Sequence, residues 1–344
     1  MSKKYFKGQI ENINPTVKLD LIDRKILYLL GQNARISTNA IAKKIKISRD
    51  IVSYRIKKLS EQKVISGFIT YINLRSLGYT IFTVFLRLKN LEREKEIITY
   101  LDHSSNVVLV QNCGGYYNLQ FEVATIEIEH FDSFFSEFIS KFDNLVVSYD
   151  ILLQVTTQYT GRGAIVGNKE LQAQLDNIKD AKGSSFMKEF NLKQSKKEVD
   201  LVDKKILKAL SLNSRMPILG VAKKTKLAPN TVINRLRTLI KSKVIKQFLV
   251  VLNFNLMGYQ WHSLLLKLKN VDQEKLFTFC KNHPNIAFIA SYIGMWNYKI
   301  SIFTQNNYEF HDVVQEFQDL FSDHILEYGS MIMYSRIKYD QKLG

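Results

Sequence analysis

A repeat with a period of 180 residues constrains the fold of this chain more than any other feature. Residues 19–90 align with residues 199–270 without a gap, and 27 of the 72 aligned positions are identical. After one single-residue indel the match continues at an offset of 179. This period is far longer than that of a solenoid repeat, so each copy is expected to fold as a unit of its own.

Composition excludes several classes of protein. Cys113 and Cys280 occupy different places in the repeat, so a disulfide framework is not expected. Residues 1–9 contain no apolar segment behind their lysines, and the most apolar run, residues 79–88, is too short to span a bilayer. The sequence therefore predicts a cytoplasmic protein without a membrane partner.

The formal charge of +17 is concentrated in two segments. Residues 19–65 contain 11 basic and 4 acidic residues, and residues 199–245 contain 11 basic and 2 acidic residues. These segments therefore carry +16, and the remaining 250 residues are nearly neutral. Two compact basic segments joined to near-neutral domains are typical of two binding surfaces for a polyanion.

Each basic segment has the spacing of three short helices with tight turns. In the first copy, Ser48 is a suitable N-cap for a third helix over residues 49–62, whose buried positions are Val52, Ile56 and Leu59. In the second copy Pro229 takes the first turn of the matching helix, where its missing N–H has no consequence. This pattern predicts a plain or winged helix-turn-helix.

After the third helix the apolar period changes from 3.6 to 2, which indicates strands. Strands are expected at 65–74, 79–89, 107–113, 119–125 and 145–156, and helices at 92–101 and 130–142. From residue 79 the order is β-α-β-β-α-β, a ferredoxin-like sandwich, and the second copy repeats it from residue 259. The predicted class is α+β, with a linker at 160–197 in which a helix is expected around residues 168–179.

The order of these elements and two local strings resemble the Lrp/AsnC (feast/famine) family of transcription regulators. The strings are LDLIDRKILYLLGQNARIS at 19–37 and IAKKIKISRDIVSYRIKKLSEQKVISGF at 41–68. Members usually carry one unit per chain and dimerise, so this chain would supply a covalent pseudo-dimer. The resemblance implies a tail at 1–17, helix-turn-helix domains at 18–66 and 198–246, and ACT/RAM-like domains at 67–159 and 247–338.

The third helix of each copy is the expected recognition helix, since a major groove admits one helix. Helical geometry turns eight candidate base-reading residues outward, namely Arg49, Ser53, Tyr54, Lys57, Asn230, Thr231, Asn234 and Arg237. Phosphate contacts are expected from Lys43, Lys44, Lys46, Arg55, Lys58, Lys223, Lys224, Lys226, Arg235 and Lys241. The two outward faces differ, which predicts two unlike half-sites in double-stranded DNA. For any single lysine a solvated helix face is an alternative, but it does not explain why both clusters coincide with the helix-turn-helix pattern.

The resemblance also implies a small effector, such as an amino acid, near a glycine-containing turn of the sandwich domain, and assembly into homo-oligomers through these domains. The matching residues are Gly115, Asn118, Gly294 and Asn297. Asparagine stands at both places where family members carry an acidic residue. A plain hairpin turn explains the same residues.

Enzyme chemistry has little support in the sequence. The six histidines form no H-x-x-x-H spacing, no C-x-x-C, P-loop or G-x-S-x-G is present, and no metal or cofactor is expected. Sirohaem decarboxylases resemble the same two-part fold, but their pocket motifs are rich in histidine and arginine. Residues 107–123 and 286–302 contain neither. A chromatin-organising protein of low sequence specificity is a further alternative.

Overall fold

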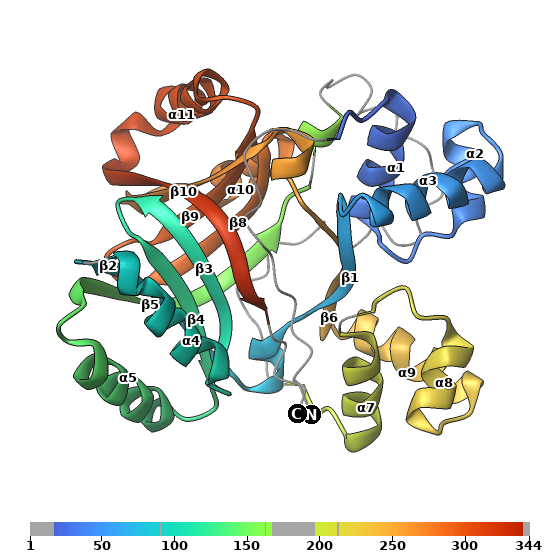
Figure 1. Ribbon diagram of the computed structural model, residues 1–344, viewed down its shortest axis with the longest axis horizontal. Coiled ribbons are helices and arrows are strands. Elements are labelled where there is room, and N and C mark those ends of the chain that lie inside the picture. The colour runs from blue at the N-terminus through green and yellow to red at the C-terminus, as the bar shows by residue number, and fades with distance from the viewer. Residues whose placement is uncertain (1–16, 90, 162, 167–196, 212, 340–344) are drawn as a thin grey trace.

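The computed structural model contains the predicted unit twice, and the two copies are closely intertwined (Figure 1). It describes residues 17–89, 91–161, 163–166, 197–211 and 213–339. The helix expected around residues 168–179, the tail up to residue 16 and most of the linker therefore lie outside the described residues.

Each basic segment folds into three helices, which we call the first head and the second head. The first head contains α1 (Leu21–Gln32), α2 (Thr38–Ile45) and α3 (Arg49–Glu61). The second head contains α7 (Leu201–Leu210), α8 (Ile218–Thr225) and α9 (Pro229–Lys241). These bounds confirm the helices expected from the apolar spacing.

Side-chain caps explain why the helices of the first head begin where they do. Asp20 accepts the N–H of Asp23, and the Asp23 carboxylate accepts the N–H of Asp20, which completes a capping box. Ser37 and Ser48 accept the N–H groups of Ala40 and Ile51 at the starts of α2 and α3. The helix-turn-helix is therefore encoded locally by polar residues at fixed spacing.

The two β-α-β-β-α-β units form the second layer of the molecule. The first copy supplies β2 (Thr80–Leu88), α4 (Glu94–His103), β3 (Val107–Gly115), β4 (Leu119–Thr125), α5 (Ile128–Phe142) and β5 (Val146–Tyr159). The second copy supplies β7 (Gln260–Leu268), α10 (Gln273–Asn282), β8 (Ile286–Ile293), β9 (Tyr298–Thr304), α11 (Asn307–Phe321) and β10 (Ile325–Tyr339). The predicted order of elements is confirmed in both copies.

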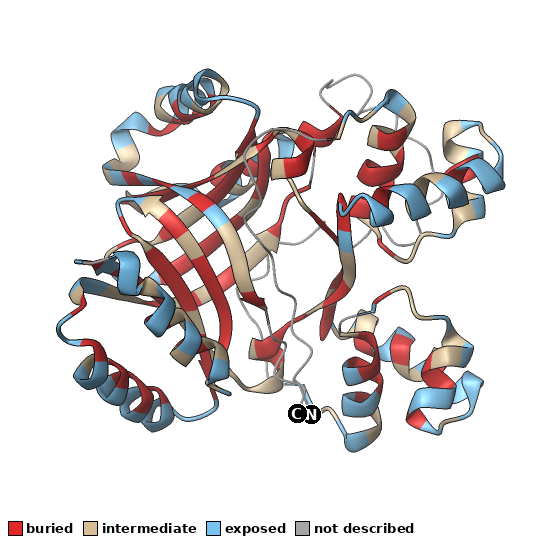
Figure 2. Cartoon of the chain, viewed as in Figure 1, coloured by how far each residue is buried: buried red, intermediate tan, exposed pale blue. Residues whose placement is uncertain are grey.

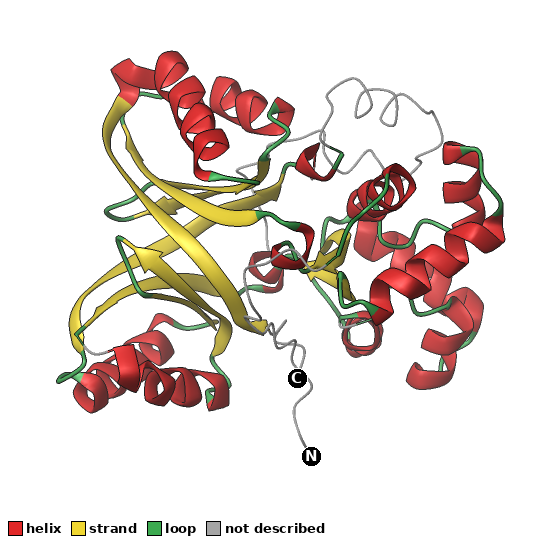
Figure 3. Cartoon of the chain, turned by 45° about the horizontal axis from the view of Figure 1, so that its top comes forward, coloured by secondary structure: helices red, strands yellow, loops and turns green. Residues whose placement is uncertain are grey.

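The two sheets join into one closed barrel with the strand order β10-β3-β4-β2-β5-β8-β9-β7. Closure depends on β5 and β10, which are long enough to pair within their own sheet and with the other copy. The helices of both copies cover the outside of this barrel (Figure 3). Phe138 of α5 and Phe317 of α11 are fully buried on the inner faces of these helices.

A two-stranded ribbon connects the barrel to the heads. Strand β1 (Ile65–Ile72) pairs antiparallel with β6 (Ile245–Leu252) from the other copy, so the strand after α3 forms no wing within its own head. The core of the first head includes Val250, Tyr259 and Phe303 of the second copy, and that of the second head includes Ile72 of the first. Each head is therefore completed by residues of the opposite copy.

The start of the predicted linker needs correction. Residues 160–161 and 163–166 are buried, and Ile165 packs in the core of the first head. The apolar run Ala-Ile-Val at 164–166 accounts for this, because burial of these side chains stabilises an ordered segment.

Among the described residues, no helix is both long and apolar enough to cross a membrane.

Candidate nucleic-acid interface

The third helix of each head presents its polar face to solvent. All eight residues predicted to read bases are exposed, and Tyr54 is 63% exposed. Val52, Leu59, Val232 and Leu239 are buried on the opposite faces of α3 and α9. Figure 2 shows exposed residues along the outer surfaces of both heads. Both helices therefore have the orientation that the spacing of their apolar residues predicted, with the candidate base-reading side chains facing solvent.

Among the residues that the structure describes, the outward side chains of α3 make only local contacts. The Ser53 hydroxyl donates to the carbonyl oxygen of Arg49 at 3.0 Å, and Lys57 lies 3.8 Å from Glu61. An exposed ion pair of this kind contributes little to stability. These side chains can therefore exchange their present contacts for bases or phosphates at little free-energy cost.

Lysines surround both helices, as the charge distribution predicted. Lys44 is half-buried, whereas the other predicted lysines are exposed: Lys43, Lys46, Lys58, Lys223, Lys224, Lys226 and Lys241. Lys63 and Lys243 are also exposed, in the turns that follow α3 and α9, where both adopt positive φ. The prediction did not include these two residues, although their identity between the copies was a usable signal.

Arg55 and Arg235 form ion pairs within their own heads. Arg55 lies 2.6 Å from Asp20 and 3.2 Å from Asp23, while Arg235 lies 2.8 Å from Asp200 and 3.5 Å from Asp203. Burial opposes ionisation of Asp20, but the Asp23 N–H and Arg55 outweigh this effect and lower the pKa of its carboxyl. These pairs join α3 to α1 and α9 to α7. They give the arginine that both copies carry a partner within its own head, and its phosphate contact stays a prediction.

Two further arginines join the heads to each other. Arg35 donates to the carbonyl oxygens of Ser214 and, at 3.1 Å, Met216. Arg215 donates to the carbonyl oxygens of Ala34 and Ile36, at 2.5 and 3.0 Å. Arg35 and Arg215 occupy matching positions of the repeat, and no role was predicted for them. A conserved spacing of Asn and Arg just after the first helix of each copy was the available signal.

The predicted effector residues all have structural contacts. Asn118 accepts the N–H of Leu88 at 2.7 Å, and Asn297 accepts the N–H of Leu268 at 2.9 Å. Gly115 has a φ of +107°, and a Cβ there would lie 2.9 Å from the carbonyl oxygen of Ser330 in the other copy. Gly294 is likewise close to β5. These four residues therefore shape the hairpin turns where the copies meet.

Comparison with known proteins identifies the family. Residues 19–60 match the AsnC-type helix-turn-helix domain, and residues 199–246 match a winged helix-turn-helix DNA-binding domain. An uncharacterized HTH-type transcriptional regulator of Pyrococcus furiosus is 32% identical over 103 residues, which are 30% of this chain and 70% of that protein. The HTH-type transcriptional regulator Ptr1 of Methanocaldococcus jannaschii is 30% identical over 127 residues, covering 37% of this chain and 86% of Ptr1. This chain belongs to the Lrp/AsnC family.

The tandem arrangement of this Lrp/AsnC protein has a counterpart among solved structures. The siroheme decarboxylase NirDL superposes with a TM-score of 0.57 and covers 94% of this chain and 93% of its own, at 12% sequence identity. Likeness at this identity concerns the fold alone. Within the described residues, no group of three or more histidine, cysteine, aspartate or glutamate side chains is placed to hold a metal ion.

Proposed function

We propose that this protein is a cytoplasmic transcription regulator that binds specific sequences in double-stranded DNA as a covalent pseudo-dimer. The observation that carries the proposal is the pair of heads, each with an exposed polar face on its third helix and exposed lysines around it. The Arg35 and Arg215 contacts hold these heads in one relative orientation. Membership of the Lrp/AsnC family supports the same function.

In this proposal, α3 and α9 enter successive major grooves and the lysines neutralise the flanking phosphates. Arginine can bridge guanine O6 and N7, and asparagine can bridge adenine N6 and N7. Tandem helix-turn-helix heads of this kind bind half-sites about one helical turn, or a multiple of it, apart. The covalent link raises the effective concentration of the second head once the first has bound.

The two half-sites are expected to differ in sequence. Arg49 and Ser53 of α3 correspond to Pro229 and Ile233 of α9, and Tyr54 corresponds to Asn234. Different side chains at matching positions present different donors and acceptors to the base edges. A symmetric operator would therefore be a poor match for one of the heads.

An effector and higher assembly belong to this proposal on family grounds. A small molecule such as an amino acid would act near the hairpins of Gly115 and Gly294, and homo-oligomers would form through the barrels. Because Asn118 and Asn297 each accept a backbone N–H, an effector would contact the remaining polar atoms of these turns.

Selection from a random duplex pool at about 0.15 M salt tests the function. Enrichment of a motif with two unlike half-sites supports the sequence-specific regulator. Strong retention without enrichment favours a chromatin-organising protein. Absence of retention contradicts both, and the siroheme-decarboxylase-like fold would then direct the search to an enzyme, although β3–β4 and β8–β9 contain neither histidine nor arginine.

A further inference from the structure

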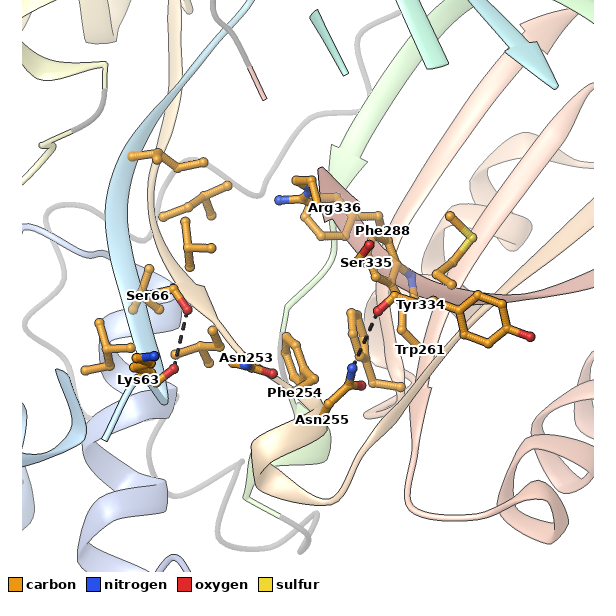
Figure 4. Close-up of a pocket in the computed structure, with 18 of the residues that line it drawn as sticks. Lys63, Ser66, Asn253, Phe254, Asn255, Trp261, Phe288, Tyr334, Ser335 and Arg336 are labelled. Carbon is orange, nitrogen blue, oxygen red and sulfur yellow. Dashed lines mark hydrogen bonds between the residues drawn. The ribbon is translucent and has the colours of Figure 1, made fainter. Parts of the chain in front are cut away.

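A cavity of about 400 Å³ lies between the ribbon and one end of the barrel (Figure 4). Ser60 and Lys63, at and just after the end of α3, line one side. Strand β6 and the loop that follows it, with Asn253 and Asn255, line the ribbon side, and Trp261 and Arg336 line the barrel side. The cavity therefore lies where the first head, the ribbon and the barrel meet. Its volume is within the range of small-molecule sites.

The internal repeat gives this cavity a pseudo-equivalent position in the other half of the molecule, with which its side chains can be compared. In the first copy, Arg75 donates to the carbonyl oxygens of Gln154, at 3.3 Å, and Val155, both on β5. Its counterpart at an offset of 180 is Asn255, whose shorter side chain reaches the matching carbonyl of Tyr334 only at 3.5 Å. The second copy therefore lacks the long side chain that occupies this place in the first.

A second long cation is replaced in the same way. Lys246 of the second copy extends to the carbonyl oxygen of Thr157 at 3.0 Å, and its ammonium lies 5.4 Å from the centre of the Tyr71 ring. The residue at the matching position beside the cavity is Ser66. Arg75 and Lys246 thus fill one of the two pseudo-equivalent positions between ribbon and barrel. The short side chains of Asn255 and Ser66 leave the other position open.

Three stacked side chains in the wall of the open site are aromatic, whereas the residues at the three matching positions are aliphatic. Phe254 and Phe303 stack with ring centroids 3.9 Å apart, and Trp261 stacks on Phe303 at 5.6 Å, with interplanar angles of 27° and 21°. The corresponding residues of the first copy are Leu74, Ala124 and Ile81. Near-parallel rings offer flat surfaces on which another planar group can stack.

The charged groups at this cavity are cationic. The Arg336 guanidinium lies 5.5 Å from the centre of the Trp261 ring, and Lys63 lines the opposite side (Figure 4). None of the described residues that line the cavity is acidic. The indole N–H of Trp261 is buried and has no hydrogen-bond partner among the described residues. Cations and a buried donor beside aromatic rings favour an anion on a planar group.

We propose that this cavity is a ligand site for a small planar molecule that carries a carboxylate group. The planar part stacks against the rings of Trp261 and Phe303, and the carboxylate faces Arg336, while Lys63 adds positive charge from the opposite side. The amides of Asn253 and Asn255 supply further hydrogen bonds. Because only one of the two pseudo-equivalent positions is open, one molecule binds per chain. The proposal does not depend on DNA binding, so either can fail without the other.

Fluorine NMR of the full chain labelled with 5-fluorotryptophan tests this site. The chain has two tryptophans, and Trp296 is fully buried between the copies, so it serves as an internal reference for Trp261. Benzoate, indole-3-carboxylate and 1-naphthoate are titrated beside their uncharged amides. We expect a saturable shift of the Trp261 resonance with at least one carboxylate, and about tenfold weaker binding of its amide.

Two substitutions copied from the filled pseudo-equivalent position are expected to close the site. Asn255→Arg introduces the side chain that Arg75 supplies in the first copy, and Ser66→Lys introduces that of Lys246. Either change should abolish the shift. Asn282→Arg, an asparagine-to-arginine change at an exposed position of α10, should leave the shift intact. Thermal melts identify a variant that misfolds. In that case the titration of the other, folded variant tests whether closing the site abolishes the shift. No saturable shift up to about 10 mM carboxylate, or undiminished binding by a folded closing variant, overturns the proposal.

Discussion

Arg35 and Arg215 cross the boundary between the heads in opposite directions, and each binds backbone carbonyl oxygens of the head opposite. The guanidinium groups also lie over Phe248 and Phe68, at 5.4 and 5.3 Å from the ring centres. Burial, together with the nearby charge of Arg215, lowers the pKa of Arg35, yet an arginine remains protonated at physiological pH. The heads are therefore joined by charge-assisted hydrogen bonds as well as by the ribbon.

Replacement of Arg35 or Arg215 should weaken the contact between the two heads and lower the stability of the chain. Arg35→Ala leaves two carbonyl oxygens without their charged donor, so we expect the free energy of unfolding to fall by about 2–4 kcal/mol. Arg35→Lys should recover only part of this loss, because one ammonium does not reproduce the planar fork. Urea denaturation measures the effect, and Lys281→Ala on exposed α10 is the control. Equal stability of the alanine variant and this control would contradict the assigned role.

Base recognition is expected to divide between the heads. Arg49→Ala should weaken binding to one half-site by about 1–3 kcal/mol, and Asn234→Ala should weaken binding to the other by a similar amount. Fluorescence anisotropy with duplexes that keep one half-site and scramble the other measures each effect separately. If both variants lose affinity equally on fully scrambled DNA, these residues do not read bases.

Removal of one lysine near the recognition helix should act independently of DNA sequence. Lys43→Ala removes one phosphate contact, so the slope of log affinity against log salt should become shallower by about one. The same titration with Lys95→Ala, an exposed lysine of α4 on the barrel, should give the wild-type slope. Equal slopes for the two variants would place Lys43 outside the DNA interface.

His262 should make the stability of the chain depend on pH. His262 is 2% exposed and its ring stacks on Phe310 at 4.1 Å, and burial lowers its pKa to about 4. The unfolded chain binds this proton near pH 6.5, so stability present above pH 6.5 is lost as the pH falls toward 4. The loss is at most about 3–4 kcal/mol for this shift.

The first copy provides the control for this prediction. Phe82 occupies the position that matches His262, and it stacks on Phe131 at 3.9 Å. His262→Phe should therefore be accommodated and should flatten the stability profile between pH 6.5 and 4. Urea denaturation across this range measures the profile, and an unchanged slope in the variant would assign the pH dependence to other groups.

The sequence allowed the helices and most strands to be predicted because their determinants are local. Ser48 before the apolar spacing of α3 defined the start of that helix. The strand after it was expected to reach residue 74, but β1 ends at Ile72 and Leu74 begins a 3₁₀ turn that ends at Gly78 with a φ of +92°. A period of two does not distinguish the last residue of a strand from an apolar residue in the next turn.

Pairings between distant residues could not be predicted from local pattern. The ribbon joins β1 to β6 across about half of the chain, and alternation along either strand does not identify its partner. Arg55 was predicted to contact a phosphate because both copies carry this arginine, and its ion pairs with Asp20 and Asp23 were not predicted. The acidic residues Asp20 and Asp23, repeated as Asp200 and Asp203, were a signal that the arginine had a partner inside the head.

The completion of each head by the opposite copy has an evolutionary consequence. In an assembly of two identical subunits, one gene places every substitution on both sides of the symmetry axis, so a change that benefits one side is also imposed on the other. In this chain Arg75 and Asn255 occupy pseudo-equivalent places and have diverged separately. Neither copy can be lost, because each supplies part of the other's core. Fusion has therefore kept both halves indispensable while allowing selection to act on them one at a time.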